Sequence, residues 1–151
     1  MDRTKLVWNL KSFEELTRDE LYKIIRARLE VFVIEQNCSY LDTDNYDQKA
    51  LHLWAEYEGE VMAYCRLFDV GIKYEETSIG RVLTTQKARG LNIGRELVGN
   101  AVQIIENVYK TSKIRISAQD YLLKFYSEFG FIATDKKYLE DNLPHTEMYR
   151  L

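Results

Sequence analysis

The stretch from residue 79 to residue 118 constrains the fold more than any other feature of this chain. Ile79 to Thr85 is an apolar-rich run, and Lys113 to Ala118 alternates between polar and apolar residues as a strand does. Between them, apolar residues recur at helical spacing at Leu97, Ala101, Ile104, Ile105 and Val108. A strand, a crossover helix and a second strand of one sheet form a unit with parallel strands. The sequence therefore predicts that these two strands lie side by side, connected by the helix.

The loop that leads into this helix is the second constraint. It reads Arg89-Gly90-Leu91-Asn92-Ile93-Gly94, so a run of backbone N–H groups precedes the helix. Free amides and the positive end of the helix dipole together favour a bound pyrophosphate. The loop is not a P-loop, because no Gly-Lys-Ser/Thr follows, and its glycines lack the GxGxxG spacing of dinucleotide-binding folds. The alternative is an ordinary glycine-containing turn that caps the helix.

The remaining elements follow from hydrophobic periodicity and turn residues. Thr17-Arg18-Asp19-Glu20 has the form of a capping box, and the apolar stripe after it predicts a helix from Arg18 to Phe32. The runs Leu51–Tyr57 and Val61–Phe68 predict a hairpin. Further strands are expected at Val7–Leu10, Phe131–Thr134 and Glu147–Leu151, a short helix at Leu122–Phe129, and an acidic loop at Gln36–Lys49. This order predicts an α/β (α+β mixed) fold, in which one domain, residues 1–151, has a mixed sheet with helices on both faces.

Composition excludes several classes of function. A net charge of −3 argues against a nucleic-acid partner, because non-specific phosphate binders carry a basic surplus. The local basic cluster of Lys87, Arg89 and Arg95 suits a small anionic ligand better. The chain has no signal-peptide core and no apolar run long enough to cross a bilayer, so we expect a cytoplasmic protein without a membrane partner. Its two cysteines are expected to be reduced thiols, with Cys65 in the core.

The acidic segment from Asp42 to Asp47 invites comparison with a calcium site. An EF-hand loop has glycine at its sixth position and glutamate at its twelfth, whereas this segment has Asp47 and Leu53 there. We therefore expect no metal. The segment is either a solvated loop or an acidic wall that attracts a cationic amine.

Several motifs together resemble one family. The strand, the Arg89–Gly94 loop and the helix resemble the pyrophosphate-binding motif of GNAT-superfamily N-acetyltransferases, Q/R-x-x-G-x-G/A. The resemblance to the ElaA-like branch covers nearly the whole chain, through Arg28–Gln36, Ile79–Val82, Ser117–Gln119, Phe125–Tyr126, Phe129–Phe131, Tyr138–Asp141 and Pro144–His145. It implies the GNAT-like fold, with a central mixed and mostly antiparallel sheet. It also implies transfer of an acetyl group from acetyl-CoA to a primary amine, by direct attack in a ternary complex.

The resemblance assigns roles to individual residues. It implies that the pantetheine arm of acetyl-CoA pairs with backbone groups of three strand residues, Val82, Leu83 and Thr84. It implies that the pyrophosphate is held by the amides of the loop residues Arg89, Gly90, Leu91, Asn92, Ile93 and Gly94. Gln119 stands near the pantetheine where many family members have asparagine, and Tyr126 stands at the position of the usual general acid. Asn92 departs from the glycine of the motif, but asparagine is the non-glycine residue that most readily adopts left-handed geometry.

Amine acetylation has chemical requirements of its own. The amine attacks as a neutral nucleophile, a donor stabilises the developing oxyanion, and the departing thiolate takes a proton. Tyr126 is expected to supply this proton, and its alternative role is that of a core aromatic. The general base is left open among Glu35, His52, His145 and Glu147, with Glu35 and His145 preferred.

Arg28, Asp44 and Asp47 are expected at the acceptor site. Together with Arg66 they also resemble the front half of acyl-homoserine-lactone synthases, distant relatives on the same fold. An acyltransferase of that kind is the first alternative function, and a CoA-binding sensor module without turnover is the second. Acetyl-CoA and a small amine are the expected partners of a monomer or homodimer. The sequence leaves the identity of the amine open.

Overall fold

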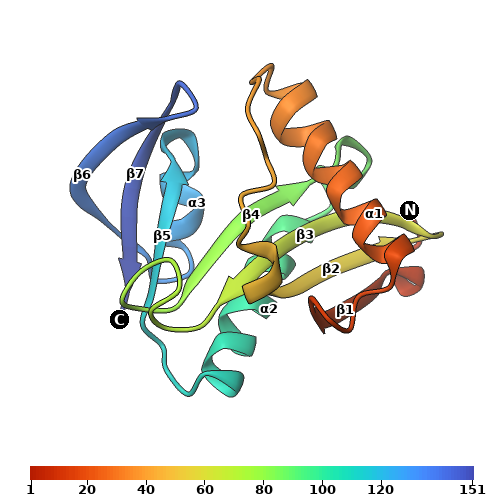
Figure 1. Ribbon diagram of the computed structural model, residues 1–151, viewed down its shortest axis with the longest axis horizontal. Coiled ribbons are helices and arrows are strands. Elements are labelled where there is room, and N and C mark those ends of the chain that lie inside the picture. The colour runs from red at the N-terminus through yellow and green to blue at the C-terminus, as the bar shows by residue number, and fades with distance from the viewer.

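Two antiparallel sheets form the framework of the protein, and the computed structural model describes all 151 residues (Figure 1). The first sheet has the strand order β1-β2-β3-β4, with β1 at Val7–Ser12, β2 at Leu51–Tyr57, β3 at Glu60–Phe68 and β4 at Ser78–Thr84. The second has the order β5-β7-β6, with β5 at Ile114–Gln119, β6 at Ile132–Glu140 and β7 at Leu143–Arg150. Four short 3₁₀ turns lie at Arg3–Lys5, Asp47–Lys49, Gln86–Ala88 and Asp120–Leu122.

The helices α1 (Arg18–Arg28) and α2 (Ile93–Val108) cover opposite faces of the first sheet, and the short α3 (Leu123–Ser127) follows β5. Ile24 of α1 packs in one buried cluster with Trp54, whereas Leu97 of α2 packs in the other with Leu53 and Cys65. Neighbouring residues of one strand supply both cores because successive side chains point to opposite faces. The predicted mixed fold with helices on both faces is confirmed. None of the helices combines the length and apolar character needed to span a membrane.

The first helix begins as predicted and changes geometry before its predicted end. The Thr17 side chain accepts from the Glu20 amide at 3.1 Å and the Glu20 carboxylate accepts from the Thr17 amide at 2.8 Å, which confirms the capping box. After Arg28 the chain continues as a π-helical turn, η2 (Leu29–Glu35), instead of an α-helix to Phe32. The wider turn keeps Phe32 in the core while it brings the following residues toward the second sheet.

The strands confirm the central hairpin and extend the C-terminal one. β2 and β3 pair with the predicted boundaries, displaced by one residue at the start of β3. The two late strands are longer than the predicted Phe131–Thr134 and Glu147–Leu151. Most of β6 is exposed, so its sequence has no apolar alternation from which its length could be recognised. The turn between them has two residues with positive φ, Asp141 at 51° and Asn142 at 64°, as a tight hairpin turn requires.

The two strands of the crossover unit meet at one point and then diverge. A single parallel bridge joins Thr77 to Ile114, with the Arg115 amide 2.9 Å from the Thr77 carbonyl oxygen. Beyond it β4 and β5 belong to different sheets and separate, as Figure 1 shows. The expectation that they lie side by side is therefore correct only at their starts. A bulge explains the divergence: at Arg81, φ is 51° and β4 advances one residue more than β3, which bends and twists the strand.

Candidate functional site

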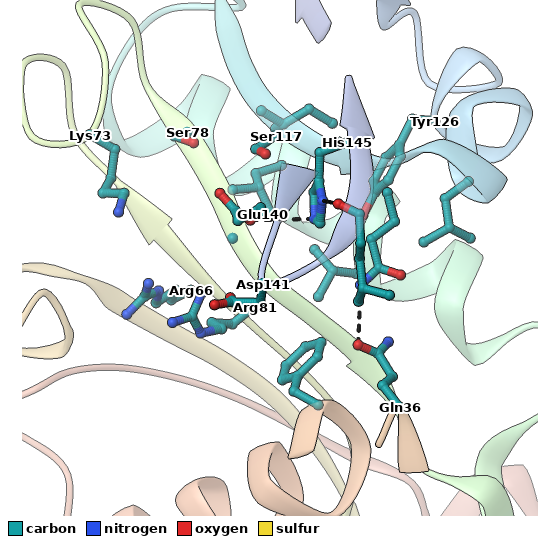
Figure 2. A pocket seen from close by; sticks show the side chains of 18 of the residues that line it. Gln36, Arg66, Lys73, Ser78, Arg81, Ser117, Tyr126, Glu140, Asp141 and His145 are labelled. Carbon is teal, nitrogen blue, oxygen red and sulfur yellow. Dashed lines mark hydrogen bonds and ion pairs between the residues drawn. The ribbon is translucent and has the colours of Figure 1, made fainter. Parts of the chain in front are cut away.

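A pocket lies where β4 and β5 diverge (Figure 2). Gly80, Arg81 and Val82 of β4 line one side, and Ser117 and Gln119 of β5 line the other. The end of η2, α3 and the β6–β7 turn complete the wall, with Gln36, Tyr126, Glu140, Asp141 and His145 among the lining residues. Beyond Thr77, no strand pairs with the edge of β4 that faces away from β3.

The loop before α2 leaves its backbone amides free. No amide from Gly90 to Arg95 donates a hydrogen bond within the chain, and the first helical bond is that of the Glu96 amide to the Asn92 carbonyl oxygen at 3.2 Å. Asn92 has φ 61° and ψ 15°, which is the left-handed geometry that asparagine tolerates best among the non-glycine residues. Gly90 also has a positive φ, 81°. Asn92 thus adopts the left-handed conformation expected for a residue in place of the motif glycine, and the loop has donors available for an anion.

Ion pairs tie this loop to the rest of the protein. Arg89 contacts Glu35 at 2.6 Å and donates to the Thr84 carbonyl oxygen at 2.9 Å, so it connects the end of η2 to the end of β4. Arg3 contacts the Leu91 carbonyl oxygen and the Glu96 carboxylate. Glu35 therefore lies beside the loop and does not line the pocket, and the Thr84 carbonyl already has a partner.

Tyr126 lines the pocket from α3. Its side chain is 6% exposed, packs edge-on against Phe125 and Phe131, and makes no hydrogen bond through its hydroxyl within the chain. Burial raises the pKa of Tyr126, so the phenol is protonated at neutral pH. The side chain is thus both a core aromatic and a pocket residue with a free hydroxyl. The phenol therefore has a proton and no partner within the chain.

His145 lines the same pocket from β7, opposite Gln119 in the β5–β7 register. Its Nδ1 lies 2.8 Å from the Leu143 carbonyl oxygen, which only accepts, so Nδ1 carries the hydrogen. In the neutral ring Nε2 is then the basic nitrogen. It lies 3.3 Å from Glu140 Oε2 (Figure 2). The ring also stacks on Tyr138 with centroids 6.1 Å apart.

The other bases considered lie elsewhere. His52 is fully buried between the Tyr64 hydroxyl at 2.7 Å and the Asp47 carbonyl oxygen at 2.9 Å, and burial lowers its pKa. Glu147 pairs with Arg115 at 3.0 Å. Among Glu35, His52, His145 and Glu147, only His145 lines the pocket.

Two side-chain hydrogen bonds connect β5 to other elements at this site. Gln119 Nε2 at the end of β5 lies 3.4 Å from Gln36 Oε1 at the end of η2, drawn as the dashed line at Gln36 in Figure 2. The Tyr138 hydroxyl on β6 bonds the Ser117 hydroxyl on β5. Gln119, for which the resemblance implied a position near the pantetheine, lies at the end of β5 where the strands have diverged.

The acidic loop forms a buried ion-pair network. Arg28 donates to Asp42 and Asp47, both at 2.7 Å, and all three side chains are buried. Arg66 donates to the same Asp47 oxygen and to Asp44, each at 2.8 Å. Arg28, Asp44 and Asp47 do not line the pocket. Arg66, which is bonded to both aspartates, does line it. The segment is thus neither a solvated loop nor an exposed acidic wall.

The network shifts the acidity of its carboxyl groups. Burial alone would raise the pKa of Asp44, but the hydrogen bonds and charge of Arg66 outweigh burial and hold it well below the ordinary value. Burial also opposes ionisation of Asp47, and the charges and hydrogen bonds of Arg28 and Arg66 again lower its pKa. Both carboxyl groups are therefore ionised at neutral pH.

Sequence reasoning missed several pocket residues. Gln36, Lys73, Arg81, Glu140 and Asp141 line the pocket without having been assigned a role. Arg81 and the pair Glu140–Asp141 fall within motifs of the resemblance, so a signal existed for them. Lys73 lies in the connection between β3 and β4, where neither periodicity nor a motif indicates a function.

Comparisons with known proteins agree with this geometry. The family model described as acetyltransferase (GNAT) domain matches residues 15–151. A UPF0039 protein of Synechocystis is 35% identical over 93% of this chain and 92% of that protein. The structure of an acyl-CoA N-acyltransferase from Pseudomonas aeruginosa superposes with a TM-score of 0.90 at 38% identity, covering 96% of this chain and 99% of that one.

A further structural neighbour connects the chain to a named branch. Escherichia coli ElaA superposes with a TM-score of 0.90 at 32% identity, covering 97% of this chain and 99% of that one. A CoA-dependent acyl-homoserine lactone synthase, with a TM-score of 0.77 at 16% identity, shares the fold only. The matched domain, the diverging strands and the free loop amides lead to one conclusion: the chain belongs to the GNAT acetyltransferase family, in the branch that includes ElaA.

Proposed function

We propose that the protein transfers the acetyl group of acetyl-CoA to a primary amine, by direct attack of the amine in a ternary complex. The observation that carries this proposal is the pocket between β4 and β5, together with the free amides of the loop that connects β4 to α2. Acyltransferase chemistry is the property of the family. Acetyl-CoA as donor and an amine as acceptor are the specific parts of the proposal.

The residues present fit an acyl-CoA. Of the amides from Arg89 to Gly94, that of Arg89 donates to the Gln86 carbonyl oxygen at 3.3 Å. The free amides of Gly90, Leu91, Asn92, Ile93 and Gly94 offer donors to a pyrophosphate. The unpaired edge of β4 at Val82 and Leu83 offers backbone groups to the amides of a pantetheine arm. Gln119 and Tyr126 lie at the far end of this path, where the thioester would be expected.

Two side chains are placed for proton transfer in our proposal. His145 accepts the amine proton at Nε2, because Nδ1 is committed to the Leu143 carbonyl and Glu140 stabilises the resulting imidazolium. Tyr126 donates the proton that the leaving thiolate needs. Glu35 acts differently in this scheme: it positions Arg89 beside the loop instead of accepting a proton.

The acidic network supports the acceptor site indirectly. Arg28, Asp44 and Asp47 are proposed to position Arg66 in the pocket wall and not to touch the acceptor, since their own atoms point into the network. These residues would then still affect acceptor binding, as expected, but through the position of Arg66 and not through contact with the acceptor.

The test is turnover of acetyl-CoA, measured as thiol release across a panel of primary amines. A CoA thermal shift accompanies it, because a ligand selective for the folded state stabilises it by about 2.7 kcal/mol at one hundred times its Kd. Binding with amine-dependent thiol release supports the proposal. Binding without turnover for any amine would favour a sensor module, and preference for long acyl chains with S-adenosylmethionine would favour a lactone synthase.

A further inference from the structure

We propose that the acceptor is a small zwitterion, a molecule with a carboxylate in addition to its primary amine, as in an amino acid. The proposal rests on the transferase function above and specifies its substrate class. The pocket carries opposite charges on different elements: Arg66, Lys73 and Arg81 come from β3, β4 and their connection, whereas Glu140 and Asp141 come from the β6–β7 turn (Figure 2).

The cationic side chains on this side of the pocket and the Arg28 that shares their carboxylates together carry one positive charge more than those carboxylates can neutralise. Three carboxylates, those of Asp42, Asp44 and Asp47, are shared among four cations, Arg28, Arg66, Arg81 and Lys73. The arginines have contacts at 2.9 Å or less, whereas the Lys73 ammonium lies 4.0 Å from Asp44 and rests 4.1 Å above the Tyr46 ring. Lys73 is therefore the cation left for an anionic ligand.

The surroundings of Lys73 agree with this assignment. Burial and the neighbouring Arg66 charge lower the pKa of Lys73, the direction expected for a cation that lacks a close anion. Its side chain remains 32% exposed, so a ligand can reach it.

Arg66 shows a second unsatisfied donor in the same wall. The residue is 1% exposed and its Nε has no acceptor within the chain. The atom lies 3.8 Å from the point where a Cβ on Gly80 would stand, and both Arg66 and Gly80 line the pocket. A buried donor without an acceptor is unfavourable, and an anionic ligand that reached it would offset this cost.

The opposite side suits the binding of an ammonium group. Glu140 and Asp141 provide negative charge, and Glu140 lies 3.3 Å from the basic nitrogen of His145. An amine held there is next to the side chain that we propose as its base. A carboxylate on the same molecule then faces Lys73. A polyamine would instead place positive charge against Arg66, Lys73 and Arg81.

Contacts across the pocket rim favour a small acceptor over a protein tail. The Cys38 thiol lies 3.0 Å from the Asp141 carbonyl oxygen, which joins the loop after η2 to the β6–β7 turn. Gln36 and Gln119 form a second link between the same loop region and β5. Both links lie beside the pocket, so its walls are connected to one another on that side.

The experiment measures kcat/KM for thiol release at saturating acetyl-CoA, with sets of three matched acceptors. Each set contains an amino acid, its carboxamide and the amine that lacks the carboxyl group. Spermidine is included as a polyamine. We expect the amino acid of at least one set to exceed its two analogues by about tenfold to a hundredfold, the range for one charge-assisted hydrogen bond.

Variants locate the effect. Lys73→Gln should raise KM for the amino acid about tenfold or more while kcat and the KM for acetyl-CoA change little, and Lys73→Arg should restore most of the loss. Lys49→Gln is the matched control, because Lys49 lies over the same Tyr46 ring at 5.6 Å but does not line the pocket. It should behave as the wild type.

The outcomes distinguish this proposal from the function on which it rests. Acetylation of amines, carboxamides or spermidine with efficiency equal to or above that of amino acids would overturn the zwitterion and leave the transferase intact. So would an equal effect of Lys73→Gln on charged and uncharged acceptors. Absence of thiol release with every acceptor, by a protein that binds CoA, would overturn the transferase function and the zwitterion together.

Discussion

Among single residues, Tyr126 has a structural role in the core and a proposed chemical role in the pocket. Its ring packs in the core, and its hydroxyl has no partner within the chain. Tyr126→Phe removes only the hydroxyl, so the fold should survive. We expect kcat to fall about 10²- to 10⁴-fold, the usual contribution of general acid catalysis, with little change in CoA affinity. The measurement is kcat under chemistry-limited conditions, together with CoA binding by calorimetry.

A surface tyrosine provides the control for this substitution. Tyr121 is 74% exposed and lies five residues before Tyr126, so Tyr121→Phe should leave kcat unchanged. If Tyr126→Phe retains more than half of the wild-type rate, Tyr126 is a core aromatic only and another group protonates the thiolate.

Asn92 is a second residue whose backbone geometry makes a prediction. At φ 61° a glycine fits without strain, whereas a β-branched residue is strained by about 1–2 kcal/mol. Asn92→Gly should keep or improve CoA affinity, and Asn92→Val should weaken it and lower the Tm. Titration with CoA and thermal unfolding measure both. The Asn92 side chain accepts from Arg95 at 3.3 Å, and a large loss in the glycine variant would show that this contact is required.

At the scale of elements, Arg28 joins α1 to the acidic loop. It is fully buried and bonds Asp42 and Asp47, so its removal leaves two buried carboxylates short of a cation. Breaking a buried pair in this way costs about 3–5 kcal/mol, a large part of the typical 5–15 kcal/mol stability of a domain. We expect Arg28→Ala to lower the free energy of unfolding by that amount, measured by chemical denaturation.

The same helix offers a matched control. Arg26 is exposed and pairs only with Glu30, four residues later, at 3.3 Å, a contact worth about 0.3–0.5 kcal/mol. Arg26→Ala should therefore change stability little. Equal losses for the two variants would mean that the buried network does not contribute the specific stabilisation described.

For the whole molecule, the buried carboxylates set the response to acid. The pKa values of Asp44 and Asp47 are depressed in the folded state, so the unfolded chain binds protons first as pH falls. Their contribution to stability is complete above the unfolded pKa of about 4 and is lost as pH falls from there through the folded values. We expect a Tm that is insensitive to these groups between about pH 5 and 7 and decreases below about pH 4.

A variant assigns that decrease to the network. Asp47→Asn removes one titrating group, so it should start from a lower Tm at pH 7 and lose less between pH 5 and pH 3 than the wild type does. Circular dichroism melts across this range provide the comparison. Parallel curves for the two proteins would assign acid sensitivity to other carboxyl groups.

Local sequence determined the elements and the conformation of the loop before α2. The capping box of α1, the β2–β3 hairpin and the stripe of α2 are encoded by neighbouring residues, and each is present. The left-handed conformation of Asn92 also follows from a local preference, and Tyr126 lies in the pocket, as its position in the motif suggested. Such features depend on periodicity, capping and backbone sterics, which operate over a few residues.

Tertiary structure decided the features that depend on distant partners. The bulge at Arg81 separates β4 from β5, and only this divergence creates the pocket in which His145 and Tyr126 meet. Whether an aspartate faces water or a buried arginine depends on residues 14 to 22 positions away, as in the pairs Arg28–Asp42 and Arg66–Asp44. Charge on its own does not specify a partner in the sequence, because burial and packing select which ions meet. Lys73 could not be recognised from the sequence for the same reason. Its proposed role depends on the lack of a close carboxylate partner in the folded chain, where its contact with Asp44 is 4.0 Å long.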